Sequence, residues 1–238
     1  MNRPNLVTFS RTDLVARKME EIAKEFAEHF KVKRNYFRQF CKIFQNSKYW
    51  NIKNLSVKLK NWSTNFQQIS GTNKIIILVQ KAFNLCEIDK DISDLRGILV
   101  EALVIAKHGG SEILNDPAYG WGAKVYINDD ENKKVIRYYC PFNNAKEKKE
   151  ECGNRATIDF AFWNGRHGKF YECKVNPVGI GCKEIKYMDR LRSEFCSYKI
   201  SLETFFVCAE NEESIKMKLS QLGCPVLFKP MGVESLEV

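Results

Sequence analysis

Two kinds of hydrophobic spacing divide this chain of 238 residues. Up to about residue 107, apolar side chains recur every three or four positions, as on the buried face of a helix. From Trp121 onwards the spacing falls to two, which is typical of strands. The pattern therefore predicts a helical first part and a second part that is built on a sheet.

The helical part starts with a capping arrangement of Ser10 and Asp13, which predicts a helix from there. This helix is expected to continue through Phe44 with a break near Lys33. Residues 74–86 fit a helix or a buried strand, and the helix is the favoured interpretation. The other helices are expected at residues 54–69, 94–107, 183–198 and 211–222.

Strands are expected at residues 123–128, 133–140, 156–163, 169–175, 203–209 and 225–229. Helices and strands in this order are typical of an α/β or α+β fold, in which a sheet carries helices on its faces. A polar joint at residues 87–93 predicts two parts. These are a basic helical N-terminal region, residues 1–90, and a sheet domain, residues 91–238.

Two of the expected strands carry charge although their other residues are typical of buried strands. Asp159 lies in A-T-I-D-F-A-F-W, and Glu172 and Lys174 lie in F-Y-E-C-K-V. Strands rich in aromatic and β-branched residues have little reason to carry charge. Because burying a lone carboxylate is costly, these groups are expected to need one another or a metal ion. Two carboxylates and an ammonium are a minimal set for holding a divalent cation and hydrolysing a phosphodiester.

The short N-G-R-H connection between these strands predicts an antiparallel hairpin. If Trp163 pairs with Gly168, Asp159 lies opposite Glu172 with their Cβ atoms roughly 5 Å apart. Two bare carboxylates at that distance repel, and one takes up a proton unless Mg²⁺ lies between them. A slip of the register by about two residues would place Asp159 opposite Lys174, still on the same face.

Basic residues are concentrated in the first part of the chain. Residues 1–70 hold 14 Lys and Arg against 5 Asp and Glu, and no acidic residue occurs between His29 and Cys86. Aromatic residues lie among the basic ones, so the stretch is expected to attract a polyanion, with nucleic acid as the leading candidate. A solvated helix face with packed aromatics is the alternative. The expected nucleic-acid contacts here are Lys31, Lys33, Arg34, Arg38 and Lys42.

Cysteine usage and the N-terminus indicate the compartment. There are nine cysteines, with no C-x-x-C pair, and the first residues lack the apolar core of a signal peptide. The longest aliphatic run, residues 75–79, is too short to span a bilayer. We expect reduced thiols in a cytoplasmic protein without membrane contact; a zinc site that includes Cys140 and Cys152 is the alternative.

The charged strands resemble the motif of the PD-(D/E)xK nuclease superfamily, whose fold is that of restriction endonucleases. The I-D at residues 158–159 corresponds to its P-D, and the E-C-K at residues 172–174 to its (D/E)-x-K. Glu101 corresponds to the acid of the preceding helix. One departure is Ile158, which stands where the namesake proline would be. The resemblance covers about residues 93–210 and implies a restriction-endonuclease-like mixed central sheet flanked by helices.

By this resemblance, Asp159, Glu172 and the backbone carbonyl of Cys173 would bind Mg²⁺ or Mn²⁺, ions that prefer hard oxygen ligands. Glu101 would complete the metal shell or hold a second ion. Lys174 would orient or help deprotonate the attacking water and stabilise the pentavalent phosphorus.

Further candidates lie beside this motif. Arg155 is expected to contact a phosphate of the substrate. Similar nucleases often carry a Lys or Gln on the helix that follows the motif. Spacing alone does not choose among Lys183, Lys186 and Asp189 for such a position.

The leading hypothesis is a Mg²⁺-dependent endonuclease that cleaves DNA in restriction-modification or antiphage defence. A DNA repair or phage DNA-processing nuclease is an alternative, as is a nucleic-acid-binding protein with an inert nuclease fold. A third reading is an interaction protein whose acids bind nothing. Similar nucleases often pair to cut both strands, so a homodimer or a partner protein from a defence complex is a further expectation. The absence of a Gly-rich phosphate loop, a nucleophile elbow and an H-E-x-x-H motif argues against a kinase, an esterase and a zinc protease.

Overall fold

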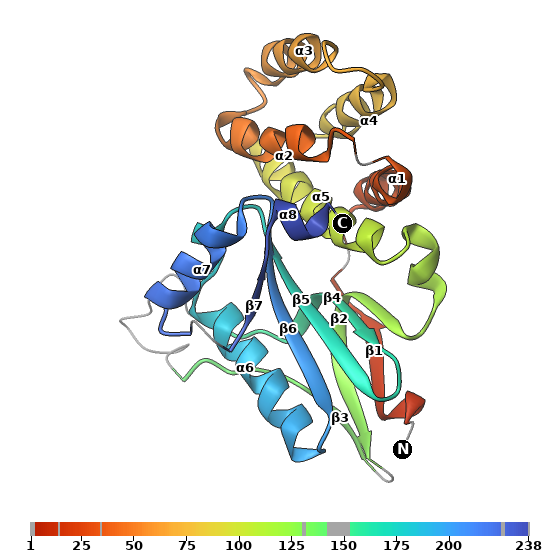
Figure 1. Cartoon of the computed structure of the whole chain (residues 1–238), viewed down its shortest axis with the longest axis vertical. Coiled ribbons are helices and arrows are strands. Elements are labelled where there is room, and N and C mark those ends of the chain that lie inside the picture. The colour runs from red at the N-terminus through yellow and green to blue at the C-terminus, as the bar shows by residue number, and fades with distance from the viewer. Residues whose placement is uncertain are drawn as a thin grey trace.

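A computed structural model describes residues 3–13, 15–33, 35–129, 132–141, 153–224 and 227–237 of the chain. Within these residues the fold is mixed α/β, with one central sheet and helices around it, which confirms the predicted fold class (Figure 1). Helices α1 to α4 gather at one end of the molecule, at the top of Figure 1, and the strands run away from them.

The described strands form one mixed sheet of seven strands in the order β1-β2-β4-β5-β6-β7, and β3 pairs with β2. The pairs β5–β6 and β6–β7 are parallel, and the other pairs are antiparallel. The strands are β1 (Val7–Arg11), β2 (Tyr119–Asp129), β3 (Asn132–Val135), β4 (Thr157–Trp163), β5 (His167–Lys174), β6 (Ser201–Cys208) and β7 (Lys229–Met231).

Helices make up the rest of the regular structure. Short 3₁₀ segments are η1 (Pro4–Leu6), η2 (Ser47–Tyr49), η3 (Ser111–Asn115) and η4 (Pro177–Gly179). The α-helices are α1 (Arg17–Val32), α2 (Phe37–Asn46), α3 (Leu55–Phe66), α4 (Asn73–Phe83), α5 (Asp89–Lys107), α6 (Cys182–Ser197), α7 (Glu212–Gln221) and α8 (Val233–Leu236). Every described helix is too short or too polar to cross a bilayer.

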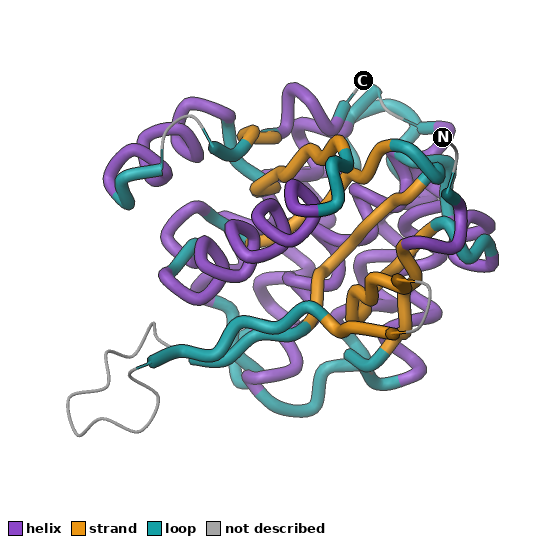
Figure 2. Tube along the Cα trace, turned by 90° about the horizontal axis from the view of Figure 1, so that it is seen from below, coloured by secondary structure: helices purple, strands orange, loops and turns teal. Residues whose placement is uncertain are grey.

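The two faces of the sheet pack against different helices. Phe205 and Val207 of β6 belong to the core that includes α5, whereas Phe206 and Cys208 belong to the core under α6 and α7. This alternation follows from the period of two in a strand. Seen from below, the strands (orange) accordingly lie among helices (purple) (Figure 2).

The secondary structure predicted for the first residues of the chain is wrong in one respect. Residues Val7–Arg11 form an edge strand that pairs with β2, and α1 begins only at Arg17. Asp13 accepts a hydrogen bond from the hydroxyl of Thr157 on β4. The boundary at residue 90 therefore does not separate a helical region from the sheet, because β1 comes from the first part. The core is also continuous, since Phe26 of α1 and Leu99 of α5 belong to one cluster.

The other elements agree with the expected ones to within a few residues, with two differences. The strand expected at residues 133–140 is regular only over Asn132–Val135. Beyond it, Tyr138 forms an isolated antiparallel bridge with Arg155, and the two extended stretches around this bridge lie side by side (teal, Figure 2). The last strand lies at Lys229–Met231 instead of residues 225–229, of which residues 225 and 226 lie outside the described part.

Candidate active site

The β4–β5 hairpin has the register that the sequence predicts. Trp163 pairs with Gly168, and the ladder continues to Phe160 and Tyr171. At the next position the carboxylate of Asp159 enters the ladder, where its Oδ2 accepts the Cys173 N–H at 2.7 Å. In a strand, the N–H and C=O groups of one residue point towards the same neighbouring strand. The Cys173 carbonyl therefore also faces the Asp159 side of β5.

A change in side-chain direction at Asp159 was not expected. Ile158 belongs to the core under α6, and Phe160 to the core under α5, although strand alternation predicts one face for both. Opposite this position, on β2, Gly122 has a φ of +53°. A Cβ at Gly122 would approach the Cβ of Asp13 to 2.9 Å. The backbone of β2 at this point thus requires a glycine, and Asp159 lies between two residues that face different cores.

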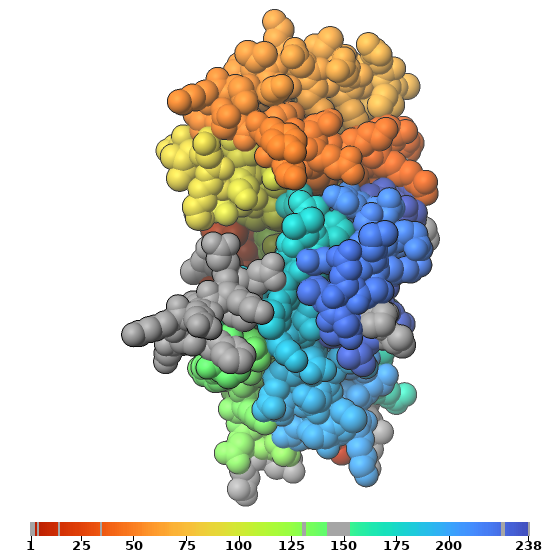
Figure 3. Space-filling model, turned by 90° about the vertical axis from the view of Figure 1, so that its left-hand side faces the viewer, coloured from red at the N-terminus to blue at the C-terminus, as the bar shows by residue number. Residues whose placement is uncertain are grey.

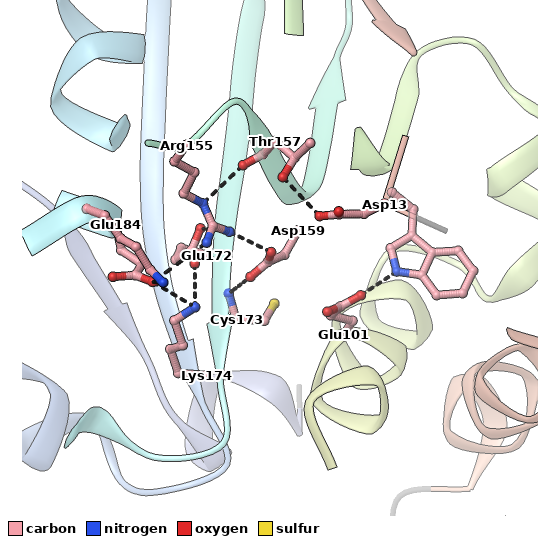
Figure 4. A network of polar contacts seen from close by, with 11 residues as sticks. Asp13, Glu101, Arg155, Thr157, Asp159, Glu172, Cys173, Lys174 and Glu184 are labelled. Atoms are coloured by element: carbon pink, nitrogen blue, oxygen red, sulfur yellow. Dashed lines mark hydrogen bonds and ion pairs between the residues drawn. The ribbon is translucent and has the colours of Figure 1, made fainter. Parts of the chain in front are cut away.

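Arg155 holds the predicted carboxylates together (Figure 4). Its Nη2 lies 2.8 Å from Asp159 Oδ1 and 2.7 Å from Glu172 Oε2, and its Nη1 lies 3.6 Å from Glu184 Oε1. The Tyr138 bridge fixes its backbone. The Arg155 side chain is only 14% exposed. The sequence analysis predicts that Arg155 contacts a phosphate of the substrate. In the structure its guanidinium instead pairs with carboxylates of the protein itself.

Glu172 and Lys174 form a second contact in the same network. Lys174 Nζ lies 2.8 Å from Glu172 Oε1 and 3.3 Å from Glu184 Oε1. Glu172 is completely buried, and burial raises its pKa to about 7 against the opposing effect of Arg155 and Lys174. Burial acts to lower the pKa of Lys174, but the charges of Glu172 and Asp159 outweigh it and raise that pKa.

Glu101 approaches from the other side of the sheet, on α5. Its Oε2 accepts the indole N–H of Trp121 at 2.5 Å. Burial raises the pKa of Glu101 to about 8, and the negative charge of Asp159 acts in the same direction. The charge of Asp159 thus favours the protonated form of Glu101, and a bound cation would have the opposite effect.

Four of the predicted residues line one cavity of about 450 Å³, named here the acidic cavity. They are Glu101, Asp159, Cys173 and Lys174; the first two turns of α5 add Asp91, Ser93 and Asp94. Glu172 is not part of this lining, since it lies behind Lys174 and Arg155 on the α6 side (Figure 4). The structure thus brings Asp159 and Glu101 to a shared space and keeps Glu172 in the supporting network.

The donor set of the acidic cavity suits a hard divalent cation. Glu101, Asp159 and the Cys173 carbonyl supply oxygen donors beside a space that is large enough for water ligands. Together with Glu172 and Glu184 the cluster holds four carboxyl groups against two buried cations, Arg155 and Lys174. With no ion bound, the Glu101 carboxyl group therefore keeps a proton at pH 7, as its pKa of about 8 indicates. Among the described residues, however, no three acidic, His or Cys side chains form a ready-made cage.

Glu184 is the residue of this network that the sequence analysis missed. It is 3% exposed and pairs with Arg155, Lys174 and, at 3.8 Å, with Lys183 at the edge. The signal was present, because Glu184 follows Gly181 by three residues and caps α6 by accepting the Gly181 N–H at 3.1 Å. An acidic residue at that position is typical of a helix cap, so the spacing alone does not indicate its second role.

The residues that are expected to contact nucleic acid differ in whether their side chains form ion pairs within the protein. Lys31 lies 3.6 Å from Glu112 and 3.8 Å from Glu28, and Arg38 pairs with Glu237. Lys33 and Lys42 are exposed, and Arg34 lies outside the described residues. The zinc alternative cannot be placed either, because Cys152 is outside the described part; the eight described cysteines are free thiols.

Comparison with known proteins adds no further information on the site, since no family model, no curated protein and no solved structure matches the chain.

Proposed function

We propose that this protein is a metal-dependent nuclease that hydrolyses phosphodiester bonds of DNA. The observation that carries the proposal is the acidic cavity. Asp159 and Glu101 share it with Lys174, and the buried cluster around them has four carboxyl groups against two cations. Mg²⁺ or Mn²⁺ would take the place of the proton that burial and the charge of Asp159 keep on Glu101. A substrate phosphate also needs a cationic site, which the carboxylates alone do not offer.

Each residue then has a role that its position supports. Asp159, Glu101 and the Cys173 carbonyl would hold the ion, which lowers the pKa of a bound water and offsets charge on the phosphoryl oxygens. Lys174, at the wall of the cavity, would donate hydrogen bonds to the attacking water and to the phosphoryl group. Glu172 would act by holding Lys174, with Nζ 2.8 Å from its Oε1.

One observation favours a second candidate, a nucleic-acid-binding protein without catalysis. Arg155 already neutralises part of the charge between Asp159 and Glu172, so these two acids are stable together without an ion. The nuclease remains the better proposal because the charge of Asp159 still acts to raise the pKa of Glu101 on the cavity side. Restriction or antiphage defence in the cytoplasm is the setting we favour, with DNA repair and phage DNA processing as alternatives.

The test is an incubation of the purified protein with plasmid, single-stranded DNA and RNA, with Mg²⁺ or with EDTA. We expect cleavage of DNA only with Mg²⁺. Asp159→Ala, Asp159→Asn and Lys174→Ala should each lower the rate at least ~10²-fold and leave circular dichroism and DNA affinity nearly unchanged. Asp159→Asn keeps an acceptor for the Cys173 N–H, so it separates lost chemistry from a disturbed hairpin. Turnover of the wild type in EDTA would refute the proposal, and DNA binding without any cleavage would favour the second candidate.

A further inference from the structure

A second hollow adjoins the acidic cavity and has a different character. This α2–α7 groove, of about 560 Å³, lies between the end of α2 with η2 and the face of α7. Its floor includes Val175 to Val178, the segment that follows β5. Val175 lines the acidic cavity as well, so the two hollows meet at this residue. In Figure 3 the orange surface of the helical end meets the teal and blue surfaces of this segment and of α7.

The groove gathers apolar side chains that face solvent. Tyr49, Val178 and Met217 line it, and they are 74%, 79% and 64% exposed. Scattered single apolar residues on a surface need no explanation, but three around one hollow indicate a binding surface. Lys48 Nζ lies over one face of the Tyr49 ring, 5.4 Å from its centre. The opposite face would suit a planar apolar partner such as a nucleobase.

The charge of the groove is positive. Lys48 and Lys218 line it and form no ion pair with another described residue. Arg96 adds a third cation and donates to the Phe44 carbonyl at 2.6 Å. Glu210 is the acidic residue among the described lining of the groove, so three cationic side chains face one carboxylate. A partner with negative charges at regular spacing would therefore be attracted here.

We propose that the α2–α7 groove binds an unpaired stretch of a nucleic-acid strand. One base would stack on the Tyr49 ring, and the phosphates on either side of it would lie near Lys48 and Lys218. A duplex turns its base faces inward and could use only the two lysines, so the exposed apolar trio favours an unpaired strand. This inference rests on the proposed function in one respect. A strand bound in the groove would continue past Val175, which lines both hollows, to the acidic cavity.

The experiment measures binding of a fluorescein-labelled oligo(dT) of about ten nucleotides in EDTA, by fluorescence anisotropy. Tyr49→Ala should weaken binding about 5- to 150-fold, the range for loss of one stacked base, whereas Tyr49→Phe should bind like the wild type. The double variant Lys48→Ala, Lys218→Ala should lower the slope of log K against log salt by about 1.4, for two lost phosphate contacts. Circular dichroism checks that each variant is folded.

A matched control comes from α3, at the same end of the molecule. Lys58 and Lys60 are exposed there and line neither the α2–α7 groove nor the acidic cavity. The variant Lys58→Ala, Lys60→Ala removes the same charge as the groove variant and should change the affinity for oligo(dT) less than twofold.

Three results would overturn the inference. One is an affinity of Tyr49→Ala within twofold of the wild type. Another is a duplex that competes as well as the single strand and is equally sensitive to Tyr49→Ala. The third is an oligoglutamate peptide that competes equally well, because the groove would then take an acidic polypeptide. Since EDTA prevents metal-dependent cleavage, these outcomes are independent of whether the protein proves to be a nuclease.

Discussion

The guanidinium of Arg155 lies 2.8 Å from the carboxylate of Asp159, at the position where the sequence leads one to expect a metal ion or a proton. The same Nη2 nitrogen lies 2.7 Å from Glu172. Two carboxylates that would repel are thus joined by one cation of the chain itself. The hairpin that carries them can therefore form before any ion or substrate arrives.

Arg155→Gln should destabilise the protein strongly. The substitution leaves the buried Glu172 with one cation fewer, and loss of one partner of a buried ion pair costs about 3–5 kcal/mol. We expect the midpoint of urea unfolding to fall accordingly, and Mg²⁺ to restore part of the loss by supplying charge to the same acids. The measurement is urea unfolding of wild type and variant, each with Mg²⁺ and with EDTA.

Arg17→Gln is the matched control for Arg155→Gln. Arg17 pairs with Glu21 on α1, but its side chain is 91% exposed, so its loss should cost less than about 1 kcal/mol. Equal unfolding midpoints for Arg155→Gln and Arg17→Gln would show that the buried network does not depend on the arginine. An equal effect of Mg²⁺ on both variants would show that the ion does not act at these acids.

Much of the β4–β5 hairpin could be predicted from the sequence, because its determinants are local. A short turn fixes the register, and a register with Trp163 opposite Gly168 fixes which residues are neighbours. Helix positions followed in the same way from apolar spacing, as in α5 with its run of buried Leu, Val and Ile residues.

The contacts that the sequence analysis missed join residues whose proximity depends on the tertiary fold. Residues Val7–Arg11 become a strand only because β2, more than a hundred residues later, offers an edge. Arg155 turns inward because Glu172 and Glu184 provide charge, and neither is close in the sequence. Glu101 is on α5 and Asp159 is on β4, so the two acids influence each other only once α5 has packed on the sheet.

Glu101→Gln should separate ion binding from folding. Glutamine keeps an oxygen that can accept the Trp121 N–H, now 2.5 Å from Glu101. It is also neutral, like the protonated carboxyl group that a pKa of about 8 gives Glu101 at pH 7. We therefore expect stability at pH 7 to stay within about 1 kcal/mol of the wild type or to rise. Mn²⁺ affinity, measured by electron paramagnetic resonance of the free ion, should fall at least ~10-fold, since one of the proposed ligands is lost.

Glu213→Gln, on the exposed start of α7, serves as the control for Glu101→Gln. Glu213 is 80% exposed and lies far along the chain from the acidic cavity, so Mn²⁺ affinity should not change. An unchanged affinity in Glu101→Gln as well would remove Glu101 from the proposed ligand set. The role of Asp159 would then need an independent test by Asp159→Asn in the same assay.

A third prediction concerns His29, whose ring is buried in the helical end. Its Nε2 lies 2.5 Å from the Tyr36 hydroxyl, and burial, with Lys74 and Lys33 in the same direction, lowers its pKa to about 4. The unfolded chain has the ordinary value of about 6.5 and binds the proton more readily. Stability is therefore complete above pH 6.5 and is lost as the pH falls towards 4, by about 2 kcal/mol at pH 5 from this residue alone.

His29→Gln removes this proton uptake, so the variant should lose about 2 kcal/mol less than the wild type between pH 7 and pH 5. Urea unfolding at the two pH values measures the difference. The variant is expected to be less stable at pH 7, because the contact with Tyr36 is altered, but only the change with pH bears on the prediction. Equal losses in both proteins would mean that His29 takes up no additional proton on unfolding.

The basic helical surface gives a last prediction, on the salt dependence of DNA binding. Replacing Lys31, Lys33, Arg34 and Arg38 with Ala should flatten the slope of log K against log salt, by about 0.9 for each lost phosphate contact on a duplex. Lys31 lies within 4 Å of Glu28 and Glu112, and Arg38 pairs with Glu237. These two must leave internal partners before they can neutralise a phosphate.

A pair of double variants tests this difference in engagement. Lys33 and Lys42 are exposed and form no ion pair with a described residue, so Lys33→Ala, Lys42→Ala should reduce the slope more than Lys31→Ala, Arg38→Ala. Fluorescence anisotropy with a labelled duplex in EDTA, at a series of KCl concentrations, gives the slopes without cleavage. An unchanged slope in the fourfold variant would mean that this surface does not meet the DNA backbone. Its positive charge would then serve only to attract the polyanion from a distance, an effect that appears in the association rate and not in the slope of the equilibrium constant.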